Sequence, residues 1–207
     1  TDAFALPLVE IMSWQDGNRR HPRALVLAPT RELALQVGDS IKAYARKVSM
    51  RCTVVYGGVT VKPQIDRLRR GIDILVATPG RLLDLANHKG LDLSRIEFLV
   101  FDEADRMLDL GFSEEISEIL DLVPIERRTM LFSATYTQEI RDLAKIMLKE
   151  PEYIEVTPSN TAAESIVQKV HLVSRPDKRA LLIHLITQGR WAQILVFVRT
   201  KHGANKL

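Results

Sequence analysis

The stretch IEFLVFDEAD, residues 96–105, decides the fold predicted for this chain. Ile96 and residues 98–101 form an almost unbroken apolar run, which is typical of a parallel strand covered on both faces. Asp102 and Glu103 follow at once, and ionised carboxylates are unfavourable inside a strand but stable at its carboxyl end. Ligands bind at that edge in open α/β sheets, so the stretch predicts an interior strand that ends in a candidate ligand site.

The chemistry of Asp102 and Glu103 suits phosphoryl transfer. Neighbouring carboxylates at a strand end point in different directions, so one can hold Mg²⁺ through its water shell while the other takes a proton from an attacking water. The same residues, Asp-Glu-Ala-Asp, also suit the first turn of a helix, where negative charge meets the positive end of the helix dipole. On these four residues alone, both interpretations stay open.

Strand-like and helix-like segments alternate along most of the chain. Further strands are predicted at residues 24–28, 52–56, 72–77, 129–133 and 153–156. Thr30, Thr78 and Thr137 are predicted helix caps, and Pro79 stands at a first helical position. This alternation predicts βαβ units and a mainly parallel sheet flanked by helices, in the α/β class.

Residues 157–166 differ in composition from the segments around them. They are mostly small or polar and poor in apolar anchors, which is typical of a linker between domains. Beyond them, strands are predicted at 167–173 and 194–199, on either side of a helix that ends at Gly189. With 207 residues, the chain is expected to hold one domain and the beginning of a second.

Composition sets broad limits on partners and location. The net charge is only +3, so a polyanion would have to be held by a local arrangement of basic groups. Cys52 is the only cysteine, which excludes an internal disulfide and fits a reducing compartment. No segment approaches the ~20 apolar residues of a membrane span, and no signal peptide is visible. We therefore expect a cytoplasmic protein without a membrane partner.

Four more motifs occur in order along the chain: APTREL at 28–33, GG at 57–58, TPGR at 78–81 and SAT at 133–135. Together with DEAD they resemble the DEAD-box ATP-dependent RNA helicases, and their joint order is far more specific than any one motif. SNTAAESI and ILVFVRTKHGANKL make the chain similar in particular to the bacterial RhlE-type branch. The resemblance implies a RecA-like domain at 1–156, a linker at 157–166 and the start of a second RecA-like domain at 167–207.

The resemblance implies ATP and Mg²⁺ as cofactors and gives several residues roles beside them. Asp102 would position Mg²⁺, and Glu103 would orient or deprotonate the water that attacks the γ-phosphate. Thr1 matches the last residue of the family's phosphate-binding loop (P-loop), whose hydroxyl helps to hold Mg²⁺. We expect most of that loop to precede this chain. The residues that would couple nucleotide state to domain closure are Asp105, Ser133, Ala134 and Thr135.

Loops that follow the predicted strands are candidates for binding RNA. Backbone N–H groups at helix starts can hold successive phosphates without reading base identity. Taken singly, TPGR is also a capped helix start, GG a tight turn, and Arg-Thr at 199–200 the end of a strand. The family resemblance implies sequence-independent binding of single-stranded RNA or a short duplex. The residues expected to bind RNA are Pro29, Thr30, Arg31, Gly57, Gly58, Thr78, Pro79, Gly80, Arg81, Arg199 and Thr200.

The leading expectation is the core of an RNA helicase that couples ATP hydrolysis to local unwinding of short RNA duplexes. One alternative is an RNA-binding fragment without turnover, because much of the P-loop and the second domain's arginine-rich motif are expected outside the chain. Another is a nucleic-acid-dependent ATPase that acts on DNA. Proteins of ribosome assembly or RNA decay are the protein partners suggested, and the chain itself is expected to be a monomer.

Overall fold

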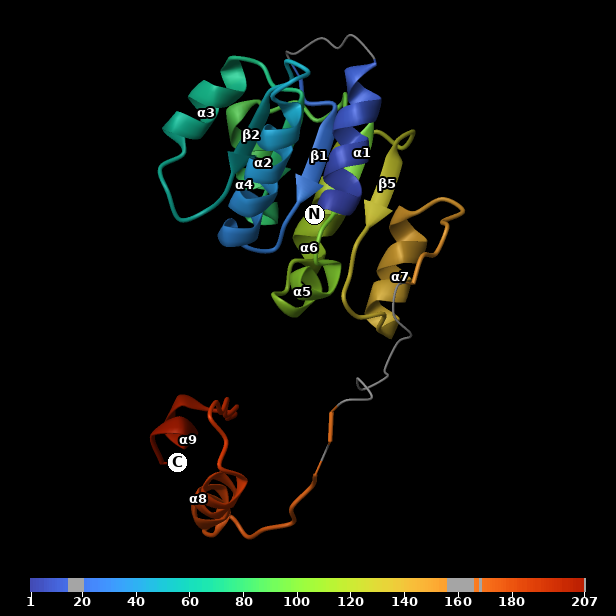
Figure 1. Cartoon of the computed structure of the whole chain (residues 1–207). Helices are drawn as coiled ribbons and strands as arrows, with labels where there is room; N and C mark the ends of the chain where they lie inside the picture. Colours follow the sequence, from blue (N-terminus) through green and yellow to red (C-terminus); the bar gives the residue numbers. More distant parts are fainter. Residues whose placement is uncertain (15–20, 156–165, 168, 207) are drawn as a thin grey trace. The chain divides into compact units, whose positions relative to one another are not determined.

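The structure is a computed structural model that describes residues 1–14, 21–155, 166–167 and 169–206. The chain divides into two compact units, Thr1–Ser159 and Asn160–Leu207. The division falls inside the predicted linker, of which residues 157–165 lie outside the described residues. The sheet lies in the first unit (Figure 1).

Five parallel strands form this sheet, in the order β2-β3-β1-β4-β5. They are β1 (Ala24–Leu27), β2 (Cys52–Val55), β3 (Ile74–Ala77), β4 (Phe98–Phe101) and β5 (Arg128–Leu131). Every residue of β1, β3 and β4 is buried, as a strand covered on both faces requires. The predicted parallel sheet, with 98–101 as an interior strand, is confirmed. The strand predicted to be buried at 129–133 is instead at the edge of the described sheet and is half-buried.

Helices cover both faces of the sheet (Figure 1). On one face, α1 (Asp2–Ser13) and α2 (Arg31–Ala45) pack against β1 through side chains such as Phe4 and Ile41. The helices that contribute to the core on the other face are α3 (Lys62–Arg69), α4 (Pro79–Lys89), α5 (Ala104–Asp109), α6 (Ser113–Leu122) and α7 (Gln138–Met147). Among the described residues, no helix has the length and apolar character that crossing a membrane requires.

Threonines stand at the starts of three helices, as predicted. The Leu33 N–H donates to Thr30 Oγ1 at 3.3 Å, and the Ile140 N–H donates to Thr137 Oγ1 at 3.4 Å. Thr78 occupies the same position before α4, with Pro79 in the first turn, but its side chain makes no capping hydrogen bond. Each of these helices follows a strand along the chain, as the crossover connections of a parallel sheet require.

Three predicted strands are wrong in the described residues. Residues 153–155 are irregular, and Ile154 is 89% exposed; Val156 lies outside the described residues. The second unit has no strand in the described residues of the two ranges predicted there, which are 167–173 without residue 168, and 194–199. Leu172 is 99% exposed. Strand N–H and C=O groups need a neighbouring strand as partner, and the described part of the second unit provides no sheet.

The second unit contains two described helices, α8 (Lys178–Gly189) and α9 (Lys201–Lys206). The helix predicted to end at Gly189 is confirmed. Neither helix has a buried residue, although α8 carries apolar side chains along its length. The assignment of 167–207 as the start of a second RecA-like domain stays a prediction.

Candidate functional site

One edge of the sheet gathers all five sequence motifs of the first unit. Because the strands are parallel, the loops that follow them leave at the same edge, toward which the arrowheads in Figure 1 point. Along the sheet, the motifs follow the strand order: GG after β2, TPGR after β3, APTREL around the end of β1, DEAD after β4 and SAT beyond β5. The predicted RNA motifs therefore lie on three adjacent strands and the predicted nucleotide motifs on the other two.

Asp102 lies at this edge, immediately after β4, and is 8% exposed. Its N–H donates to the Leu27 carbonyl oxygen at 3.0 Å, which extends the β1–β4 ladder by one residue. Burial raises the pKa of the Asp102 carboxyl; the nearby Thr1 amino group lowers it and the Glu103 charge raises it. Thr1 is thus near Asp102, and Figure 1 marks the N-terminus at this edge.

The donor set around Asp102 fits a magnesium ion bound together with phosphates. Mg²⁺ is usually held by one or two carboxylates, with water and substrate phosphates completing its octahedron. Asp102 supplies a carboxylate whose charge is disfavoured by burial, and Thr1 supplies a hydroxyl. No group of three or more His, Cys, Asp or Glu in the described chain could hold a metal ion by itself.

Glu103 differs from Asp102 in both backbone and exposure. Its backbone is left-handed, with φ 53° and ψ 54°, which costs a non-glycine residue about 1–2 kcal/mol. The next N–H, of Ala104, donates to the Phe132 carbonyl oxygen at 2.9 Å, so the start of α5 is tied to the exit of β5. The Glu103 side chain is 41% exposed, and its Oε2 lies 3.3 Å from Arg106 Nη1. One carboxylate is therefore enclosed and the other borders solvent.

Asp105 joins α5 to the SAT motif. Its Oδ2 accepts hydrogen bonds from the Thr135 N–H at 3.0 Å and the Thr135 hydroxyl at 2.9 Å. Burial, the largest single influence, raises the pKa of Asp105, but hydrogen bonds from Thr135, the Arg106 N–H and Ser133 together lower it. The Ser133 hydroxyl donates to the Thr135 carbonyl oxygen at 2.7 Å, and Ala134 is exposed. The predicted contact between Asp105 and SAT is present; its coupling role stays a prediction.

Arg81 connects TPGR to the loop that carries GG. Its Nη2 donates to the Val59 carbonyl oxygen at 3.0 Å, and its Nε lies 3.7 Å from Asp84 Oδ2. Its Nη1 is buried and has no hydrogen-bond partner. A shallow hollow of about 420 Å³ opens here, lined by Gly57, Thr78, Gly80, Arg81, Asp84 and Phe112. A buried N–H without a partner is costly, so the guanidinium of Arg81 is incompletely satisfied beside this hollow.

The APTREL and GG motifs also meet at this edge. The Arg31 guanidinium lies over the Tyr56 ring, 5.0 Å from its centroid, in a cation–π contact. Gln64 fixes the backbone of Tyr56, since its side chain bonds both the N–H and the carbonyl oxygen at 3.1 and 3.2 Å. Pro29 is buried, whereas Arg31, Gly57 and Gly58 are exposed. Sequence patterns did not single out Tyr56, Gln64 or Asp84, because their importance depends on which strands are neighbours.

Arg199 and Thr200 belong to the second unit, where the strand expected to precede them is absent. Thr200 instead caps α9, since its Oγ1 accepts the Gly203 N–H at 3.0 Å. Arg199 is exposed. Their predicted contacts to RNA stay a prediction.

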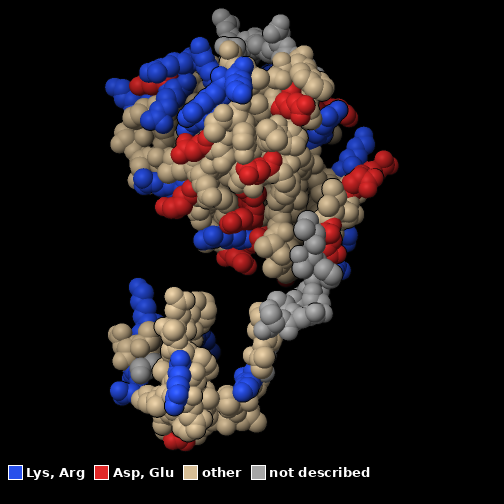
Figure 2. All heavy atoms as spheres, viewed as in Figure 1, with Lys and Arg blue, Asp and Glu red and all other residues tan. Residues whose placement is uncertain are grey.

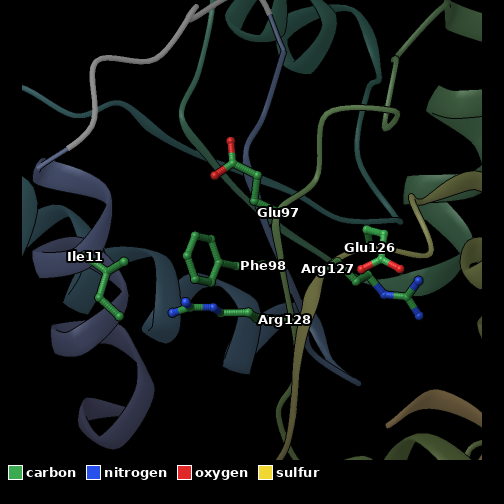
Figure 3. Close-up of a pocket in the computed structure, with 6 residues that line it drawn as sticks. All are labelled: Ile11, Glu97, Phe98, Glu126, Arg127 and Arg128. Carbon is green, nitrogen blue, oxygen red and sulfur yellow. The ribbon is translucent and has the colours of Figure 1, made fainter. Parts of the chain in front are cut away.

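A second hollow, of about 380 Å³, lies at the opposite edge of the sheet, where β4 and β5 begin (Figure 3). Figure 3 shows Phe98 and Arg128 side by side, with Ile11 of α1 facing them and Arg127 directed away. The Arg128 guanidinium is 5.9 Å from the Phe98 ring centroid, and Glu97 pairs with Arg23. This hollow contains none of the predicted site residues.

The family model "DEAD/DEAH box helicase" matches residues 1–143. The ATP-dependent RNA helicase RhlB of Pseudomonas putida is 40% identical over 189 residues, which are 90% of this chain and 48% of that protein. DEAD-box ATP-dependent RNA helicase 30 of Arabidopsis thaliana is 39% identical over 211 residues, covering 100% of this chain and 36% of that protein.

Two solved structures are similar to the described fold. The yeast DEAD-box splicing factor Prp28 matches with a TM-score of 0.67 and 34% identity, over 72% of this chain and 36% of that chain. A hypothetical ATP-dependent RNA helicase from Sulfolobus tokodaii matches with a TM-score of 0.64 and 41% identity, over 73% of this chain and 43% of that chain. The chain thus spans less than half the length of each of these relatives. None of these matches tests the RhlE-type assignment, which stays a prediction.

Proposed function

This chain belongs to the DEAD/DEAH box helicase family, and we propose that it forms the core of an ATP-dependent RNA helicase. The observation that carries the proposal is the single sheet edge at which five strand ends present DEAD, SAT, APTREL, GG and TPGR. Loops at that edge are where open α/β sheets bind ligands. The proposal assigns the loops after β2, β3 and β1 to RNA and the loops after β4 and β5 to ATP.

The RNA half of the edge suits a phosphate backbone better than bases. Gly57, Gly58 and Gly80 are exposed, so their N–H groups are accessible, and Arg31 is exposed beside them. Arg81 adds a half-buried guanidinium that lines the hollow beside them. Backbone amides and guanidinium groups bind phosphate oxygens and carry no sequence information directly. We assign Pro29–Arg31, Gly57–Gly58 and Thr78–Arg81 to sequence-independent binding of single-stranded RNA or of one strand of a short duplex.

The nucleotide half would hold Mg²⁺ and ATP. Asp102 and the Thr1 hydroxyl would hold the ion, which when bound neutralises charge on the nucleotide phosphates. Glu103, half-exposed beside Asp102, would orient the attacking water or accept its proton. Burial of Asp102 supports this division of roles, because a carboxylate with a raised pKa gains from a nearby cation.

Asp105 and the SAT motif would transmit the state of the nucleotide. The Asp105–Thr135 hydrogen bonds hold the start of α5, which follows Glu103, to the segment after β5. A ligand shifts a conformational equilibrium only through contacts that differ between the two states. We propose that ATP and RNA favour closure of two RecA-like domains, one at 1–156 and a second that starts at 167–207, joined by the linker 157–166. Arg199 and Thr200 would then add RNA contacts.

The remaining assignments follow from the same proposal. A helicase of this kind would separate short RNA duplexes locally, act in the cytoplasm, and work with proteins of ribosome assembly or RNA decay. The present chain by itself would be a monomer. The single cysteine, Cys52, fits a reducing compartment. Burial raises the pKa of its thiol to about 12, so Cys52 is an inert packing residue rather than a nucleophile.

RNA-stimulated ATP hydrolysis by the full-length gene product tests the proposed function. Unrelated RNAs of equal length should stimulate phosphate release equally, and DNA of the same sequence should stimulate it weakly. Stimulation by DNA as strong as by RNA would favour the DNA-dependent ATPase instead. RNA binding without any phosphate release would favour a binding module. A rate of phosphate release that is the same with and without nucleic acid would contradict the assignment of the three RNA loops.

A further inference from the structure

Positive charge is concentrated in one part of the chain. Residues 46–70 contain seven of the 29 Lys and Arg residues and one of the 26 Asp and Glu residues, so the rest of the chain holds more acids than bases. Figure 2 shows basic side chains gathered at the upper left of the first unit, where α3 and the end of α2 lie in Figure 1. The mild net charge of the chain therefore conceals a local basic surface.

Three short segments, all within residues 46–70, make this surface. Arg46 and Lys47 follow α2, Arg51 leads into β2, and the third segment is the end of α3 with the residue after it. Arg51 Nη1 donates to the Arg70 carbonyl oxygen at 2.6 Å, which joins the second and third segments. The basic residues of the surface, which we name the amino-edge patch, are Arg46, Lys47, Arg51, Arg67, Arg69 and Arg70, and all are exposed.

The acids near the amino-edge patch leave most of its charge uncompensated. Asp66 lies 4.0 Å from Arg69, a weak pair on an exposed helix face. Asp73 is buried and accepts the Arg51 N–H at 2.8 Å, so it fixes the backbone of the patch. None of the large apolar side chains that are exposed in the described chain belongs to residues 46–70, which form the patch. A protein interface or a membrane surface normally needs such apolar anchors, whereas a phosphate backbone does not.

Helix α3 links the amino-edge patch to the proposed RNA site. It begins at Lys62, a few residues after Gly58, and ends at Arg69 inside the patch. Eight residues at 1.5 Å each make this helix about 12 Å long, a distance that about four phosphates of a duplex strand would cover. Lys62, Arg67 and Arg69 are exposed along it. A strand bound at Gly57 and Gly58 can therefore continue along a helix that carries three exposed cations and one exposed acid, Asp66.

We propose that the amino-edge patch is a second RNA-binding surface, which holds the phosphate backbone of RNA that extends past the GG loop. The inference rests on the proposed RNA function of the opposite edge. Short RNA occupies the carboxyl edge alone, and longer RNA contacts both surfaces. The patch reads no bases, so it raises affinity for any sufficiently long RNA and makes that affinity more sensitive to salt.

RNA length separates the two surfaces in an experiment with the full chain. Affinity is measured for an oligomer of roughly six nucleotides and for one of about twenty-five, over a series of salt concentrations. The variant Lys47→Ala, Arg67→Ala, Arg70→Ala removes three patch cations and keeps Arg51. The matched control Arg95→Ala, Lys145→Ala, Lys149→Ala removes three other exposed cations of the same unit. Thermal unfolding verifies that both variants fold.

The patch variant should bind the long RNA at least about tenfold more weakly, with a salt slope reduced by about 2, and bind the short RNA as the unmodified chain does. The control should match the unmodified chain on both. Unchanged affinity for long RNA in the patch variant would overturn the inference, as would an equal loss on both lengths. A patch variant that binds long RNA as before but has lost binding to polyglutamate or to anionic vesicles would also overturn it. Failure of the unmodified chain to bind either RNA would instead overturn the proposed function.

Discussion

The two edges of the sheet differ in how their polar groups are paired. At the amino edge, where the strands begin, Arg23 forms a two-point pair with Glu97. Its Nε lies 2.7 Å from Oε1 and its Nη2 lies 2.9 Å from Oε2. At the carboxyl edge, Asp102 is buried with a raised pKa, Glu103 has a left-handed backbone, and Arg81 keeps a buried Nη1 without a partner. Unfavourable groups are thus concentrated where the motifs lie.

This difference separates residues that stabilise the sheet from residues whose unfavourable state we expect a bound ligand to relieve. Strain and unsatisfied groups persist at functional sites because binding needs them, and the rest of the fold provides the stability. The contrast has exceptions at the amino edge, because Arg127 has a buried Nε without a partner and Ser49, just before β2, has a positive φ of 53°. Substitutions at the amino edge should therefore mainly change stability, and those at the carboxyl edge mainly change activity.

Glu103→Gln should give the largest effect and should fall on activity. Removing a general base typically costs about 10²–10⁴-fold in rate, while the neutral amide preserves the shape of the side chain. RNA-stimulated phosphate release by the full-length gene product should fall by that factor, with ATP and RNA binding retained. Glu114→Gln, an exposed acid on α6, is the matched control and should be silent. Near-normal turnover in Glu103→Gln would show that this residue is not the base.

Glu97→Gln should lower stability and leave activity unchanged. Arg23 is 9% exposed at its side chain, so weakening its charged pair should cost about 1–2 kcal/mol of unfolding free energy, measured with denaturant. The hydrogen bond from Arg23 lowers the pKa of Glu97 from 4.5, so this contribution is present above that pH and is lost as the pH falls below it. The difference in unfolding free energy between Glu97→Gln and the unmodified chain should therefore become smaller below pH 4.5. A difference that is constant with pH would mean that the charge of Glu97 is not the cause.

Asp102→Asn should have the opposite effect on stability. Burial raises the pKa of Asp102 above 3.8, so the folded state is favoured by this group at low pH and is disfavoured as the pH rises through the raised value. At neutral pH, the uncharged amide should therefore increase unfolding free energy by about 1 kcal/mol, while ATP hydrolysis is lost. A destabilised Asp102→Asn protein at neutral pH would remove the contrast between the two edges.

The sequence predicted the sheet well, and it failed where a strand needs a partner. The apolar run 98–101 forms an interior strand because β1 and β5 pair with it on either side. Residues 194–199 are equally apolar, yet Phe197 is 87% exposed and no described strand pairs with them. An apolar pattern specifies which side chains gain from burial, but it does not supply the backbone partners that make a strand.

The sequence predicted the residues of the candidate site better than their geometry. Motif order along the chain is APTREL, GG, TPGR, DEAD, SAT, whereas strand order places GG at one end and TPGR next to it. The Arg81–Val59 hydrogen bond and the burial of Asp102 depend on that order, which no local pattern records. The basic residues of the amino-edge patch are visible in the sequence within 46–70, but its hydrogen bond from Arg51 to the Arg70 carbonyl oxygen appears only in the folded chain.

Two threonines at helix starts provide the smallest and most selective comparison. Thr30 accepts the Leu33 N–H, so Thr30→Val should cost about 1 kcal/mol of unfolding free energy through loss of a helix cap. Thr78 holds the same position before α4 without such a bond, so Thr78→Val should change unfolding free energy little. The Thr78 hydroxyl is not used in capping, and Thr78, although 9% exposed, lines the hollow beside Arg81, so Thr78→Val should weaken binding of unrelated RNAs by a similar factor. Equal destabilisation by both substitutions, with RNA binding unaffected in Thr78→Val, would assign Thr78 to the fold and take it out of the RNA site.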